Sequence, residues 1–175
     1  MDLLTELAIK HGTDKWGKHH YTPVYFEMFK NRRNDVEGVL EIGVAEGAGL
    51  RMFKEFFPNA TIYGAEIDKS RFFEEDRIKV FPFDQSDFDH RELSELFMHF
   101  QSLDLVVDDG SHNPVDQLLT CFGMMPFLSK DCIYVIEDVA DKKIAEYLSH
   151  KYQVSIHKVG DRYDDCLIIV RHKNG

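Results

Sequence analysis

Apolar residues recur at helical spacing in two short stretches near the start of the chain, at residues 2–11 and 22–32. Short apolar runs of strand length then alternate with further helical patterns. The predicted strands cover residues 38–43, 60–66, 78–83, 103–108, 132–136, 153–159 and 165–172. The predicted helices between them cover residues 47–57, 91–100, 114–128 and 142–150. Repeated strand–helix units with apolar strands predict a mostly parallel sheet that is covered on both faces.

The last two predicted strands have no helix between them and are joined by the turn Gly160-Asp161-Arg162. They therefore form a hairpin, which places one antiparallel strand in the sheet. We predict a three-layer, Rossmann-like α/β fold with a seven-stranded, mostly parallel sheet that ends in this hairpin. Residues 1–175 form one domain, and residues 1–35 form a helical cover.

Composition narrows the class of protein. A chain of 175 residues with 43% hydrophobic content holds one ordinary domain with a core. The net charge of -10 argues against nucleic acid as a partner, because an acidic surface repels phosphates. The start of the chain lacks a basic region followed by an apolar stretch, and no apolar run is long enough to span a bilayer. We expect a cytoplasmic location, with Cys121, Cys132 and Cys166 as buried free thiols.

The loop after the first predicted strand has glycines at spaced positions. It reads Glu41-x-Gly43-x-Ala45-x-Gly47. The dinucleotide pattern G-x-G-x-x-G would need glycines at positions 45 and 48, and both are Ala, which argues against an NAD-dependent oxidoreductase. The loop instead resembles the [DE]-x-G-x-[GA]-x-G loop of S-adenosylmethionine (SAM)-dependent methyltransferases. The alternative is a tight turn with no ligand.

Acids also follow the second and third predicted strands. An acid at the end of the second strand is placed to accept hydrogen bonds from both ribose hydroxyls of a nucleoside. Glu66 fits this position best, with Asp68 as the alternative. Asp84 and Gln85 follow the third strand, where methyltransferases contact adenine. An ordinary solvated strand end or an Asp turn explains the same residues without a ligand.

Three carboxylates follow the fourth and fifth predicted strands, at Asp109, Glu137 and Asp138. In this topology the two strands are neighbours, so their carboxyl ends lie side by side. Clustered carboxylates repel one another unless protons or a cation compensate, and oxygen ligands suit a hard divalent ion, most often Mg2+. The alternative is that these acids cap the next helices or face water.

Several motifs together resemble one family of enzymes. The stretches Leu105-Val106-Val107-Asp108-Asp109-Gly110-Ser111-His112 and Val135-Ile136-Glu137-Asp138 resemble the metal-dependent sugar O-methyltransferases of macrolide biosynthesis, the mycinamicin type, and relatives described as cephalosporin hydroxylases. The segments His11-Gly12-Thr13-Asp14-Lys15, His19-His20-Tyr21 and Tyr25 resemble the part of that family that lies against the SAM site. The resemblance implies a class I methyltransferase fold.

The resemblance also implies residue roles. Asp109, Glu137 and Asp138 would bind the metal, and His112 would be the general base with Asp109 beside it. The residues that would contact SAM are Thr13, Lys15, Tyr21, Glu41, Gly43, Gly47, Glu66, Asp68, Asp84, Gln85 and Asp108.

The expected function is Mg2+-dependent methyl transfer from SAM to a hydroxyl of a sugar, a glycosylated natural product or a polysaccharide unit. The partner would be this small molecule, and a homo-oligomer is compatible with the sequence. The alternatives are a non-catalytic or metal-independent SAM-binding protein and an NAD-dependent oxidoreductase. The macrolide enzymes carry an extra N-terminal domain and longer insertions that build a lid, whereas this chain has almost nothing between Asp138 and the helix at 142–150. The acceptor is therefore the least transferable expectation.

Overall fold

A computed structural model of the chain describes residues 1–173. Its strands are β1 (Gly38–Ile42), β2 (Thr61–Glu66), β3 (Glu74–Glu75), β4 (Ile78–Pro82), β5 (Leu105–Asp108), β6 (Ile133–Ile136), β7 (Gln153–Lys158) and β8 (Cys166–Arg171). They form one eight-stranded sheet in the order β3-β4-β2-β1-β5-β6-β8-β7.

The middle of the sheet is parallel, as the strand–helix alternation predicts. β4, β2, β1, β5 and β6 pair in parallel, and β8 then enters antiparallel between β6 and β7. The predicted hairpin is confirmed, because β7 and β8 pair antiparallel. The strand missing from the prediction is β3, whose two residues, Glu74 and Glu75, pair with β4 and are both exposed. Two exposed acids carry no apolar alternation, so the sequence contains no signal for this strand.

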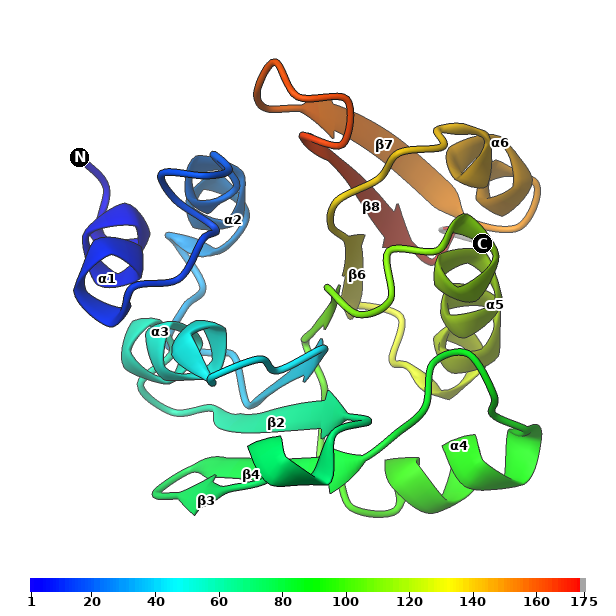
Figure 1. The fold of residues 1–175 in the computed structure, drawn as a ribbon, viewed down its shortest axis with the longest axis horizontal. Helices are drawn as coiled ribbons and strands as arrows, with labels where there is room; N and C mark the ends of the chain where they lie inside the picture. Colours follow the sequence, from blue (N-terminus) through cyan, green and yellow to red (C-terminus); the bar gives the residue numbers. More distant parts are fainter. Residues whose placement is uncertain (174–175) are drawn as a thin grey trace.

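The helices divide between the two faces of the sheet (Figure 1). The first group is α1 (Leu3–His11), α2 (Thr22–Phe29) and α3 (Ala48–Phe56), and the second is α4 (His90–Phe97), α5 (Pro114–Met124) and α6 (Lys143–Ser149). Two 3-10 turns, η1 (Lys69–Arg71) and η2 (Met125–Phe127), complete the elements. The predicted helix at 114–128 is thus an α-helix that tightens into a 3-10 turn.

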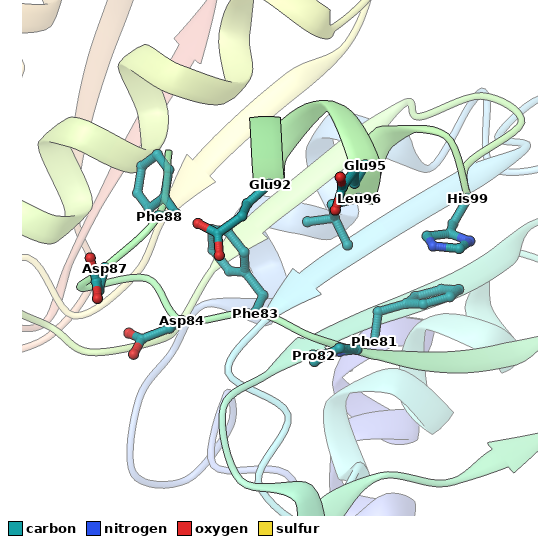
Figure 2. A pocket seen from close by; sticks show the side chains of 10 residues that line it. All are labelled: Phe81, Pro82, Phe83, Asp84, Asp87, Phe88, Glu92, Glu95, Leu96 and His99. Atoms are coloured by element: carbon teal, nitrogen blue, oxygen red, sulfur yellow. The ribbon is translucent and has the colours of Figure 1, made fainter. Parts of the chain in front are cut away.

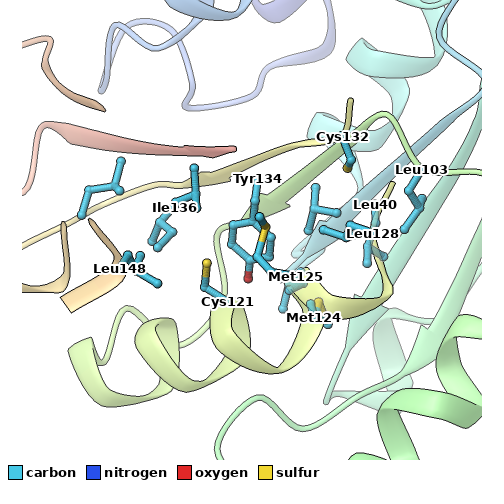
Figure 3. Packing of buried hydrophobic residues seen from close by; sticks show 14 of the residues in the cluster. Leu40, Leu103, Cys121, Met124, Met125, Leu128, Cys132, Tyr134, Ile136 and Leu148 are labelled. Atoms are coloured by element: carbon cyan, nitrogen blue, oxygen red, sulfur yellow. The ribbon is translucent and has the colours of Figure 1, made fainter. Parts of the chain in front are cut away.

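Each face of the sheet has its own hydrophobic core, because side chains alternate along every central strand. On β1, Val39 joins the core beneath α1, α2 and α3, whereas Leu40 and Ile42 join the core beneath α4, α5 and α6. Figure 3 shows the second core, where Tyr134 of β6 lies against α5 beside Cys121. The three cysteines are buried and free, as predicted.

Local signals explain where the helices beside the site begin. Asp89 forms a capping box with Glu92 at the start of α4, and Asn113 caps α5 ahead of Pro114. The cap at Asn113 fixes the start of α5, so only residues 109–113 lie between β5 and α5. Within residues 1–173, no helix combines the length and the apolar character needed to cross a membrane.

Candidate cofactor and metal site

A cleft of about 430 Å³ lies where β1, β2, β4, β5 and β6 end. This is the edge of an open α/β sheet at which ligands bind. The predicted site residues that line it are Gly43, Glu66, Asp84, Gln85, Asp109, His112 and Asp138. The lining residues that the prediction did not name as site residues include Asp14, Lys18, Ile67, Arg71, Ser86 and Ser111. The remaining predicted residues lie outside the lining: Thr13, Lys15, Tyr21, Glu41, Gly47, Asp68, Asp108 and Glu137.

The glycine loop after β1 passes close to the chain that follows β5. Gly43 has a φ of 82°, and a Cβ at this position would collide with the backbone of Asp109. Any side chain there would therefore be both strained and blocked. Ala45 also lies in the left-handed region, with a φ of 46°. This conformation is one that non-glycine residues rarely adopt.

Glu66 at the end of β2 connects the cleft to the glycine loop. Its buried carboxylate accepts hydrogen bonds from the backbone N–H of Val44 at 3.0 Å and of Asp68 at 2.9 Å. One carboxylate thus fixes the loop while it lines the cleft. Asp68, the alternative ribose acid, instead has an exposed side chain that caps η1 through Ser70. The geometry favours Glu66 for this position.

Asp108 is fully buried behind the cleft. Its carboxylate accepts hydrogen bonds from Gln85 Nε2 at 2.6 Å and from the Tyr134 hydroxyl at 3.0 Å. Burial raises the pKa of Asp108 to about 6. Gln85 Oε1 in turn accepts from the backbone N–H of Ser111 at 2.8 Å. Asp108 therefore does not line the cleft, and its carboxylate instead holds the Gln85 side chain in place.

Asp109, His112 and Asp138 converge on the far side of the cleft. Each offers one ligand atom, and these atoms lie within 4.8 Å of one another. His112 Nε2 is 3.8 Å from Asp138 Oδ2. His112 and Asp138 have φ values of 56° and 51°, which non-glycine residues rarely adopt. Strained backbone of this kind clusters at functional sites.

Lys15 lies behind this group, and its ammonium is buried. The Nζ atom is 3.0 Å from Glu41, 2.9 Å from Asp109 and 2.7 Å from Glu137. Burial alone lowers the pKa of a lysine, but these three neighbours overcome it and hold the pKa of Lys15 well above its usual range. The ammonium therefore stays charged.

Glu137 is the one predicted metal ligand that does not face the cleft. Its carboxylate accepts hydrogen bonds from Lys15 at 2.7 Å and from the Tyr25 hydroxyl at 2.5 Å. Its metal ligation stays a prediction, and it would require that carboxylate to be shared with these two partners. Tyr25 was noted in the sequence as part of a motif, but nothing there linked it to Glu137.

The segment at residues 13–25 supplies further partners. The Tyr21 hydroxyl donates to Asp138 Oδ1 at 2.5 Å, and burial together with this acceptor raises the pKa of Tyr21 well above its usual range. His19 stacks on Tyr21 and pairs with Asp165 at 2.8 Å. Thr13 is buried, and its hydroxyl accepts from the backbone N–H of Lys15. Within this segment, Asp14 lines the cleft, whereas its neighbours Thr13 and Lys15 are buried.

A second cavity of about 320 Å³ lies between β4 and α4 (Figure 2). Phe83 and Asp84 line both this cavity and the cleft. Phe81 stacks on His99 at a ring separation of 4.5 Å, and both rings line the cavity. The second cavity therefore adjoins the end of the cleft at which adenine is expected.

Known proteins of similar sequence are sugar O-methyltransferases. The chain is 38% identical over 144 residues to the 8-demethyl-8-alpha-L-rhamnosyl tetracenomycin-C 2'-O-methyltransferase of Streptomyces olivaceus, over 78% of this chain and 37% of the relative. It is 35% identical over 144 residues to the mycinamicin VI 2''-O-methyltransferase of Micromonospora griseorubida, over 78% of this chain and 36% of the relative. The chain thus spans little more than a third of these relatives. No protein-family model matches it.

Among solved structures, the MycE methyltransferase of the mycinamycin pathway, in complex with Mg and SAH, has a TM-score of 0.79 and 29% identity. The match covers 97% of this chain and 54% of that one. The SAH-bound Podospora anserina methyltransferase PaMTH1 shares the fold, with a TM-score of 0.67 at 16% identity. The fold and the cleft are those of a class I SAM-dependent methyltransferase. Within that class, the chain is related to the sugar O-methyltransferases that act on glycosylated natural products.

Proposed function

We propose that this chain is the catalytic part of a SAM-dependent O-methyltransferase that transfers a methyl group to a sugar hydroxyl of a glycosylated natural product or a polysaccharide unit. The observation that supports this most directly is the position of Asp109, His112 and Asp138 in the same cleft as the glycine loop and Glu66. A nucleoside cofactor and an acceptor hydroxyl would then meet in one place. Similarity to sugar methyltransferases over 78% of this chain favours the same substrate class.

SAM would occupy the side of the cleft formed by β1, β2 and β4. Gly43 leaves room for the methionine part, Glu66 accepts from the ribose, and Asp84 with Gln85 faces the adenine. Direct contact with SAM stays a prediction for the residues outside the lining, which are Thr13, Lys15, Tyr21, Glu41, Gly47, Asp68 and Asp108.

A divalent cation fits the opposite side. Asp109 and Asp138 offer carboxylate oxygens from neighbouring strand ends, a donor set that Mg2+ prefers. Glu137 would complete the predicted set only by sharing Oε2 with Lys15 or Oε1 with the Tyr25 hydroxyl. When bound, the metal would lower the pKa of the acceptor hydroxyl and fix its direction.

His112 is the proposed base, and its exposed ring faces the cleft. Nε2 lies near Asp138, which stabilises the imidazolium that forms when the ring accepts the proton. A nitrogen that donates its lone pair to a metal ion cannot also accept a proton. Nε2 of His112 can therefore act as a metal ligand or as the base, but not as both at once. The pH dependence of the rate, together with NMR of the His112 imidazole with and without added Mg2+, separates the two.

The test is methyl transfer from labelled SAM to a panel of rhamnosides, macrolide glycosides and polysaccharide fragments. Transfer to a sugar hydroxyl that is abolished by EDTA and restored by Mg2+ supports the whole proposal. Transfer that is unaffected by EDTA leaves a metal-independent enzyme. SAM binding with no transfer to any acceptor leaves a SAM-binding protein.

The organisation of the chain is part of the same proposal. Residues 1–175 act as one SAM-binding domain, with residues 1–35 as its helical cover. A homo-oligomer, a small-molecule partner and a cytoplasmic location stay predictions. Sedimentation of the purified protein decides the oligomeric state.

A further inference from the structure

Lys15 is a lysine whose ammonium group is buried among carboxyl groups. Lys15 is 1% exposed, and its ammonium contacts three carboxyl groups at 3.0 Å or less. Lysine is almost never fully buried unless it is paired. The loop that holds Lys15 therefore depends on these contacts.

The three carboxyl groups come from three different strands. Glu41 belongs to β1, Asp109 follows β5, and Glu137 follows β6. Two of them are themselves almost completely buried, at 2% for Glu41 and 1% for Glu137. Asp109 is the member that reaches the cleft. One ammonium thus joins the strand of the glycine loop to both strands that carry the acidic group.

Space around Glu41 shows that this arrangement is built into the chain. A Cβ at Gly49 would lie 2.5 Å from Glu41 Oε1, so a glycine is needed there for the carboxyl group to reach Lys15. Glu41 does not line the cleft. In the folded chain the Glu41 carboxyl group contacts Lys15 at 3.0 Å.

We propose that Lys15 is a positioning residue, whose ammonium serves as a permanent counter-ion that holds Asp109 in place at the cleft and Glu137 in place behind it. Acids this close together repel one another, and a buried charge whose partner is removed is strongly unfavourable. With Lys15 in place, the acids keep their arrangement before any other cation arrives. The consequence for methyl transfer rests on the proposed function, but the role itself is a property of the folded chain.

The experiment is a double-mutant cycle in the full chain. Lys15→Met removes the charge and keeps most of the side-chain volume, and Glu137→Gln removes one of its partners. We expect Lys15→Met to lower the melting temperature by about 10 °C, and by clearly less when Glu137 is already Gln. Lys10→Met is the matched control, since the Lys10–Glu55 pair is exposed and should change the melting temperature by only about 1–2 °C.

A crystal structure of Lys15→Met gives the second measurement. The Asp109 carboxylate should move from its place at the cleft, which a loss of packing alone would not cause. An unchanged Asp109, or a loss of stability that is equal in both Glu137 backgrounds, would overturn the proposal. An inactive wild-type protein in which Lys15 and Glu137 remain coupled would instead reject the proposed function and leave the role of Lys15 standing.

Discussion

The hydroxyl of Tyr21 donates a hydrogen bond of 2.5 Å to Asp138, a residue 117 positions further along the chain. Asp138 lines the cleft, whereas Tyr21 lies behind it. Outer partners of this kind fix the orientation of a ligand carboxylate. Tyr21 therefore determines which Asp138 oxygen faces the cleft.

Tyr21→Phe removes that donor and little else. We expect methyl transfer to fall about 10–100-fold, because Asp138 is no longer held in one orientation. SAM affinity should stay close to that of the wild type. The measurements are turnover and calorimetric SAM titration, with Tyr163→Phe as the exposed control. Unchanged turnover would remove Tyr21 from the site.

Changes at the glycine loop test the SAM site. Gly43→Val should abolish SAM binding, since the position has a φ of 82° and no room for a side chain. Glu66→Gln should weaken binding by about 1–3 kcal/mol, through lost hydrogen bonds to a charged group. Asp68→Asn should have a smaller effect, because Asp68 lies outside the lining. Calorimetry on the folded variants decides, and equal affinities for all three would contradict the assignment.

Replacement of His112 tests the proton acceptor. His112→Ala should lower the rate about 10²–10⁴-fold and leave SAM affinity unchanged. His150→Ala, at the exposed end of α6, is the control. If the His112→Ala variant has normal turnover, the His112 ring has a structural role only.

Removal of the metal tests the acidic group. EDTA should abolish methyl transfer and leave SAM bound, because the glycine loop and Glu66 lie on other strands. Asp138→Asn should have the same effect by lowering the charge of the ligand set. The readouts are turnover with and without added Mg2+ and the SAM dissociation constant. Full activity in EDTA would contradict a metal-dependent reaction.

The buried Asp108 predicts a pH dependence of stability. Its folded pKa of about 6 lies above the usual aspartate value of 3.8, so folding favours the protonated form. The stability that this contributes is complete below the unfolded pKa and is lost as the pH rises through about 6. Asp108→Asn lacks this titration. Between pH 5 and pH 7.5, the free energy of unfolding of the wild type should fall by about 1.4 kcal/mol relative to the variant. Denaturant titrations at both values measure this, and a constant difference would place the pKa near its usual range.

The fold was predictable because it depends on local patterns. Buried parallel strands such as β1 and β5 read as apolar runs, and the glycine loop has a recognisable spacing. The carboxyl ends of β5 and β6 are adjacent in any sheet of this topology, so Asp109 and Asp138 were expected to meet. The position of the cleft follows from these features alone.

The partners of the acids were not predictable in the same way. Whether Lys15 turns toward the cleft or away from it depends on how the segment at residues 13–25 packs on the sheet, which no periodicity describes. The same is true of Tyr25 and Glu137, whose hydrogen bond joins residues 112 positions apart. The family resemblance predicted that this segment contacts the cofactor. In the structure, Lys15, Tyr21 and Tyr25 instead contact the carboxyl groups of Asp109, Glu137 and Asp138.

The contacts of Lys15, Tyr21 and Tyr25 also bear on the order in which the protein folds. Their contacts with Asp109, Glu137 and Asp138 join the beginning of the chain to residues 94–122 positions later. Contacts between such distant positions form late, because the long loop between them must close first. During synthesis, the segment at residues 13–25 emerges long before Asp109, Glu137 and Asp138 exist. The active arrangement is therefore available only to a chain whose sheet is complete through β6, and a partly folded chain has no ordered acidic group with which to capture a metal ion.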